Sequence, residues 1–93
     1  MIRSFADSAS EQLFMSGRSR RLPGDVVGRA KRKLLMLDSA AELVDLASPP
    51  GNRLEALVGE RAGQHSVRIN DQFRICFRWS NGDAYELEVT DYH

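Results

Sequence analysis

The last four residues of the sequence are Thr90, Asp91, Tyr92 and His93, so an acid, a phenol and an imidazole stand side by side. An imidazole titrates near neutral pH and can serve as a general acid or a general base. A histidine at a chain end is usually solvated and idle, and a tyrosine near a strand end usually packs. These residues therefore indicate chemistry only if charged groups converge on them.

Three arginines supply candidate charges, because Arg68, Arg74 and Arg78 recur in stretches that alternate apolar and polar residues. Arginines abreast on a sheet repel one another, whereas guanidinium groups match the oxygens of a phosphate. The plain alternative is that Glu86 and Glu88 neutralise the row as surface ion pairs.

An imidazole, guanidinium groups and a phenol can together cleave RNA without a metal. The 2′-hydroxyl must lose a proton, the phosphorane must be stabilised, and the leaving 5′-oxygen must gain a proton. A tyrosine can stack on a base. His65 and His93 lack partners at ligand spacing, which argues against a metal site. Cys76 lies in a predicted strand and is interpreted as a small buried residue rather than a nucleophile.

Length and composition indicate one domain covering residues 1–93. Hydrophobic residues make up 42% and charged residues 28% of the chain, as in a globular protein. No apolar run approaches the roughly 20 residues of a membrane helix, and the opening "MIRSFADSASEQLF" lacks the long apolar region expected of a secretory signal. A single cysteine cannot form an internal disulfide, so we expect a cytoplasmic protein.

The net charge is zero, which argues against a nucleic-acid-binding domain as a whole, but the charge is unevenly distributed. Residues 18–33 carry seven cationic side chains and one anionic side chain, a local net charge of +6. A polyanion would respond to this segment locally, although a solvated helix face is the simpler interpretation. The four cations on the predicted helix are Arg29, Lys31, Arg32 and Lys33.

Apolar periodicity predicts an α+β protein in the order β-α-α-β-β-β, with two N-terminal helices on a mostly antiparallel, twisted sheet. The first helix is expected to be capped by Asp7 or Ser8 and to end at Gly17. The second should bury one apolar stripe. The expected elements are a strand at 2–5, helices at 8–16 and 23–39, a helical turn at 40–47, a break at 48–52, and strands at 66–69, 73–79 and 85–89.

Alternation also predicts the pairing of the strands. A three-residue loop at 70–72 places Val67 opposite Ile75 and Arg68 opposite Arg74. A three-residue loop at 80–82 would place Ile75 opposite Leu87, Phe77 opposite Tyr85, and Arg74 facing Glu88. A slip of two residues in either hairpin would keep the faces but change these partners. The end of the last strand then lies beside Arg74. Tyr92 would share the arginine face, while Asp91 and His93 would point the other way unless the strand frays.

The stretches "RINDQFRICF" and "NGDAYELEVTDYH", together with the opening "MIRSFADSASEQLF" and "RAKRKLLMLDSA", resemble HigB-type toxins of the RelE superfamily. The resemblance implies a ribosome-dependent endoribonuclease that uses no metal or other cofactor and cuts mRNA in the A site. It also implies a HigA-like helix-turn-helix antitoxin as partner, with which the toxin represses its own operon.

Carried over residue by residue, the resemblance assigns proton transfer to His93 and the transition-state phosphate to Arg74. Tyr92 would stack on or orient the substrate, and Asp91 would position the histidine or the substrate. Contacts with mRNA or ribosomal RNA are expected from Arg53, Arg61 and Arg68, and ribosome docking from Arg29, Lys31, Arg32 and Lys33.

One departure from the family pattern concerns Val58, because relatives commonly carry a functional lysine there. Either Arg61 or Arg53 then takes over the positive charge, or the toxin is weak. His65 stands where relatives often have a bulkier aromatic residue. Two other functions stay open: an inhibitor of a protein target such as gyrase, as in ParE-type relatives, and a non-catalytic homologue that only binds an antitoxin.

Overall fold

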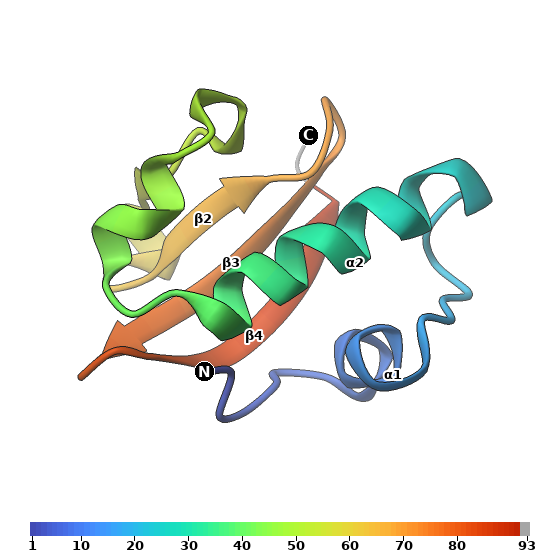
Figure 1. Ribbon diagram of the computed structural model, residues 1–93, viewed down its shortest axis with the longest axis horizontal. Coiled ribbons are helices and arrows are strands. Elements are labelled where there is room, and N and C mark those ends of the chain that lie inside the picture. Colours follow the sequence, from blue (N-terminus) through green and yellow to red (C-terminus); the bar gives the residue numbers. More distant parts are fainter. Residues whose placement is uncertain (92–93) are drawn as a thin grey trace.

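The computed structural model describes residues 1–91 and shows two helices packed on a four-stranded antiparallel sheet, as the sequence predicted. Figure 1 shows α2 crossing one face of the sheet, with α1 beside it. The strand order is β1-β2-β3-β4. The main elements are α1 (Ser8–Ser16), α2 (Gly24–Ser39), β1 (Glu55–Ala56), β2 (His65–Arg68), β3 (Phe73–Ser80) and β4 (Asp83–Asp91). Short 3-10 turns are η1 (Leu43–Ala47), η2 (Pro50–Asn52) and η3 (Gly59–Arg61).

The core lies between the helices and the facing side of the sheet. Helix α2 contributes Val26, Ala30, Leu34 and Leu37, which are buried at helical spacing. They pack with sheet residues such as Val67, Ile75, Phe77 and Leu87. Leu35, which the same apolar periodicity predicts to be buried, is 50% exposed because it lies outside the arc that faces the sheet. Within residues 1–91 no helix is long and apolar enough to span a bilayer.

Helix α1 begins and ends with the residues that the sequence predicted. The carboxylate of Asp7 accepts a hydrogen bond from the Ser10 amide at 2.8 Å, and Gly17 closes the helix with a φ of 72°. Burial raises the pKa of Asp7, but hydrogen bonds from Ser10 and the charge of Arg21 outweigh it and hold that pKa below its usual value.

Changing Asp7 to alanine should lower the free energy of unfolding by about 1 kcal/mol at neutral pH, because an orphan helix amide loses its acceptor. A lowered pKa in the folded protein means that the stabilisation is complete at neutral pH and is lost as pH falls below 3.8. Urea unfolding of the unchanged protein and of Asp7→Ala should therefore give a smaller difference in the free energy of unfolding at pH 3 than at pH 7. The control is Gln12→Ala, on the exposed side of α1. If Asp7→Ala lowers the free energy of unfolding at pH 7 no more than this control does, Asp7 does not stabilise the helix as a cap.

The N-terminal segment lies where an edge strand was expected, although it forms only two isolated bridges. Ile2 pairs with Ala84 and Phe5 with Leu87, both parallel to β4. The amides of Arg3 and Ala6 donate to carbonyls of β4 at 2.8 and 2.9 Å. Continuous pairing is interrupted because Glu86 in β4 has a φ of 52°, outside the range of an extended strand. The sheet gains its fourth strand instead from β1, which the sequence analysis did not predict.

The pairing of β2 with β3 is the predicted one. Val67 is opposite Ile75 and Arg68 is opposite Arg74. The loop at 70–72 is held by the side chain of Asn70, whose oxygen accepts from the amides of Gln72 and Phe73 at 2.9 and 2.7 Å.

The predicted pairing of β3 with β4 is wrong. The turn contains two residues, Asn81 and Gly82, both with positive φ, so Ser80 pairs with Asp83. An irregularity opposite Phe77 then adds a residue on the β4 side, near Glu86. Beyond it, Ile75 pairs with Val89 rather than Leu87, and Arg74 pairs with Thr90 rather than facing Glu88.

Candidate active site on the outer face of the sheet

The face of β2, β3 and β4 turned away from the helices, here called the outer face, carries the charged residues of these strands. By alternation from the buried core positions, Arg68, Arg74 and Glu88 belong to it. Part of this face is covered by the chain at 53–64. A Cβ at Gly63 would stand 2.8 Å from Nη1 of Arg78, so the backbone at Gly63 packs against the end of that side chain.

Arg74 is held in the middle of the outer face and has only 9% of its side chain exposed. Its Nε donates to Oγ of the buried Ser66 at 2.8 Å, and its Nη2 donates to the carbonyl of Arg53 at 2.7 Å. Glu55 of β1 lies 3.7 Å from the same Nη2. Arg74 thus ties the segment at 53–55 to the sheet and adds a positive charge beneath it.

Arg61 and Glu88 form an ion pair over Cys76. Nη2 of Arg61 lies 3.2 Å from Oε1 of Glu88, and Nη1 donates to Oε1 of Gln64 at 3.0 Å. Both charged side chains are about one third exposed, so Arg61 is more accessible than Arg74. Cys76 is fully buried, as expected. Burial raises the pKa of its thiol, with the charge of Glu88 acting in the same direction and those of Arg61 and Arg74 opposing it.

The other arginines of the outer face also have acidic partners. Arg68 pairs with Asp71, and Arg78 pairs with Glu86 at 2.6 Å. The prediction that Glu86 neutralises the row is confirmed for Arg78. Glu88, in contrast, pairs with Arg61, which lies outside the row, because η3 folds back over the sheet. Arg53 is exposed, with its carbonyl bound by Arg74.

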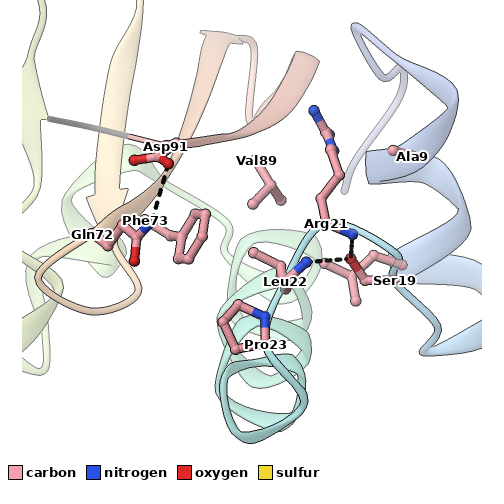
Figure 2. A pocket seen from close by; sticks show the side chains of 10 residues that line it. Ala9, Ser19, Arg21, Leu22, Pro23, Gln72, Phe73, Val89 and Asp91 are labelled. Atoms are coloured by element: carbon pink, nitrogen blue, oxygen red, sulfur yellow. Dashed lines mark hydrogen bonds between the residues drawn. The ribbon is translucent and has the colours of Figure 1, made fainter.

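Asp91 lies on the opposite side of the sheet from Arg74, as alternation predicted. It pairs with Phe73 and accepts a hydrogen bond from Nε2 of Gln72 at 3.0 Å. Figure 2 shows Asp91 at the rim of a cavity of about 260 Å³ that is also lined by Leu22 and Arg21 from the connection between the helices. Tyr92 and His93 lie outside the described residues, so their predicted orientation stays a prediction.

The four cations predicted on α2 separate into two groups. Lys31 turns toward α1, where its Nζ contacts the Phe14 carbonyl and lies 4.9 Å from the centre of the Phe14 ring. Arg29 and Arg32 are exposed, and Nζ of Lys33 contacts Oδ1 of Asn52. Burial lowers the pKa of Lys33, and the charges of Arg29, Arg32 and Arg68 lower it further. These four residues, Arg29, Arg32, Lys33 and Arg68, therefore form one cationic cluster across α2 and the end of β2.

His65 is a packing residue in this structure. Its ring stacks on Phe77 with centroids 6.2 Å apart, and its Nδ1 is buried with no hydrogen-bond partner among residues 1–91. Over the same residues, no three His, Cys, Asp or Glu side chains are grouped to hold a metal ion.

The fold and the family comparison together define the class of protein. Two helices on a four-stranded antiparallel sheet are consistent with the RelE-like toxin fold. Residues 3–93 match the model of the HigB-like toxins, described as RelE-like toxins of type II toxin–antitoxin systems. The chain therefore belongs to the HigB-like toxin family.

The most informative relatives are similar along most of their length. The chain is 40% identical over 85 residues to Toxin HigB-1 of Vibrio cholerae, covering 90% of each chain. It is 36% identical over 93 residues to Endoribonuclease HigB of Proteus vulgaris, covering all of both. An uncharacterized protein of Haemophilus influenzae is 31% identical over 67 residues, 72% of this chain and 66% of that protein. These relationships support endoribonuclease activity for the HigB family.

Two residues of the outer face were missed as parts of a site. Ser66 and Glu55 were not singled out, although both contact Arg74. The alternation that placed Arg68 and Arg74 on one face would also have placed Ser66 there. Glu55 could not have been found this way, because β1 contains only two residues and shows no alternation.

Proposed function

We propose that this chain is a ribosome-dependent, metal-independent endoribonuclease that cuts mRNA in the ribosomal A site and so stops translation. Its family membership supports an RNA-directed toxin, and the name of the Proteus vulgaris relative supports RNA cleavage. The single observation that carries the proposal is the outer face. There, Arg61 lies 3.2 Å from the carboxylate of Glu88, and Arg74 is fixed in the sheet by Ser66 and the carbonyl of Arg53.

In the proposed site, Arg61 stabilises the phosphorane because it is the more exposed of the two cations, and it takes the charge role left open by Val58. Arg74 is buried in the sheet and adds positive potential to the site from there. It also fixes the segment of Arg53 through the carbonyl of that residue, and the side chain of Arg53 contacts the RNA backbone. His93 transfers a proton, Tyr92 stacks on or orients the substrate, and Asp91 positions His93 or the substrate.

Docking to ribosomal RNA is assigned to the cationic cluster of Arg29, Arg32, Lys33 and Arg68. Arg29 and Arg32 are exposed on the helix that also carries Lys33, so several positive charges are available there to a polyanion. Lys31 is left out of this surface because its ammonium group is engaged with α1.

The proposed partners are the ribosome, its bound mRNA, and a HigA-like helix-turn-helix antitoxin that neutralises the toxin and carries it to operator DNA. A type II toxin family implies an antitoxin as such. Action on ribosomes places the protein in the cytoplasm.

Expression of the chain alone in bacterial cells should arrest growth and produce new mRNA 5′ ends within translated codons. Deleting Tyr92 and His93 should remove both effects while leaving the unfolding midpoint nearly unchanged, because two terminal residues contribute little to a core. The measurements are 5′-end mapping and urea unfolding. Toxicity that survives the deletion would show that the terminal residues do not take part.

A non-catalytic toxin homologue is the second candidate, and the observation that favours it is Val58. Its side chain is 85% exposed and cannot transfer a proton or bind a phosphate. This candidate predicts neither growth arrest nor cut mRNA from the full chain. A ParE-like inhibitor of a protein target predicts growth arrest with intact mRNA. The same mapping experiment therefore separates all three functions.

A further inference from the structure

We propose that Glu88 is a catalytic residue of this chain, the general base that removes the proton from the attacking 2′-hydroxyl of RNA. This inference rests on the proposed function and adds a group to which no role in the reaction has been assigned. It begins from the position of Glu88, which is paired with Arg61 and lies opposite Cys76 on the outer face.

The geometry around Glu88 follows from the corrected pairing of β3 with β4. Its Cα partner is Cys76, and the next pair on this face is Arg74 with Thr90. Glu88 and Arg74 are therefore diagonal neighbours, with a typical separation of about 7–8 Å. Arg61 reaches Glu88 from above at 3.2 Å. A phosphodiester bound by Arg61 would bring its neighbouring 2′-hydroxyl to the carboxylate.

Other carboxylates near this face are placed less well for the same task, and Asp71, the partner of Arg68, is almost fully exposed. Glu86 is 57% exposed and is committed to Arg78 at 2.6 Å beside the irregularity in β4. Glu55 is 52% exposed at the edge strand β1 and lies 3.7 Å from Arg74. Glu88 is the most enclosed of these carboxylates, and enclosure strengthens its interactions with a bound substrate.

The proposed step balances in atoms and charge. The 2′-O–H bond breaks and its proton passes to a carboxylate oxygen of Glu88, while the 2′-oxygen forms a bond to phosphorus. The P–O5′ bond then breaks, and the 5′-oxygen takes a proton from a general acid, the role proposed for His93. The products are a 2′,3′-cyclic phosphate and a 5′-hydroxyl end. Arg61 is released from Glu88 as that carboxylate becomes neutral and turns to the phosphorane oxygens.

The decisive variant is Glu88→Gln, which keeps an oxygen that can accept from Arg61 but cannot take up a proton. Single-turnover cleavage of mRNA on programmed ribosomes should fall by about 100- to 10,000-fold, the usual contribution of a general base. The matched control is Glu86→Gln, the same change two residues away on the same strand, which should cleave within about threefold of the unchanged protein. Equal rates for the Glu88 variant and the control would overturn the proposal.

A pH profile separates a base from a structural partner of Arg61. The charged or titratable groups facing Glu88 are Arg61 from η3 and Arg74 and Cys76 from β3, with Glu86 next to it on β4. If Glu88 is the base, the cleavage rate of the unchanged protein rises with pH through an acidic limb that the Glu88→Gln variant lacks. A uniform loss of rate with that limb intact would mean that Glu88 only positions Arg61, and would refute the assignment.

A substrate with sulfur in place of the bridging 5′-oxygen distinguishes the base from the acid, because a thiolate leaves without protonation. Cleavage by Glu88→Gln should stay slow on this substrate, whereas rescue of that variant would reassign Glu88 as the acid and overturn the proposal. If the unchanged protein cleaves no ribosome-bound mRNA at all, the proposed function itself fails, and that result is distinct from a failure of Glu88.

Discussion

Replacing Arg61 with glutamine is expected to slow mRNA cleavage by about 100- to 1,000-fold, the range seen when one preorganised transition-state contact is removed. Arg61 is more accessible than Arg74, the other guanidinium of the proposed site, and a neutral amide cannot balance the charge that develops on the phosphorane. The side chain is one third exposed and pairs with a similarly exposed glutamate, so its loss should change the free energy of unfolding by less than about 1 kcal/mol.

The control for Arg61 is Arg78→Gln. Arg78 belongs to the same face and also forms an ion pair, but it lies beside Glu86 and is more exposed. Cleavage by this variant should remain within about twofold of the unchanged protein. Single-turnover rates and urea unfolding midpoints are needed for both variants. Equal losses in the two would indicate a general electrostatic effect, and a fully active Arg61→Gln variant would remove Arg61 from the site.

Replacing Phe77 with alanine is expected to lower the free energy of unfolding by about 3–5 kcal/mol. Phe77 is fully buried in the middle of β3, and its ring packs against His65 and Trp79 with centroid separations of 6.2 and 6.3 Å. Truncation leaves a cavity that neighbours in two strands can fill only by moving. A loss of this size is a large part of the roughly 5–15 kcal/mol that stabilises a typical domain.

Urea unfolding measures this effect, and Val44→Ala serves as control. Val44 is a large apolar residue that is 67% exposed, so its truncation should change the free energy of unfolding by no more than about 0.5 kcal/mol. A change below about 1 kcal/mol for Phe77→Ala would mean that the sheet and helices close over the missing ring, contrary to the packing described above.

The sequence by itself determined the features that depend on neighbouring residues. Asp7 and Gly17 mark the ends of α1 because capping is decided within one helical turn. The three-residue loop held by Asn70 fixes the pairing of Arg68 with Arg74. Alternation then places Asp91 and Arg74 on opposite faces of the sheet. Its prediction that Tyr92 shares the face of Arg74 lies outside the described residues.

Only the tertiary structure decided which charges meet on the outer face. The two-residue turn and the irregularity near Glu86 each shift the pairing by one residue, and together they move Arg74 from Glu88 to Thr90. The irregularity has no local sequence signal, because the strand alternates on either side of it. The pairing of Arg61 with Glu88 joins residues 27 positions apart through a segment that folds back over the sheet. Such contacts are set by the free energy of packing the whole chain, whereas caps and turns are set by a few adjacent residues.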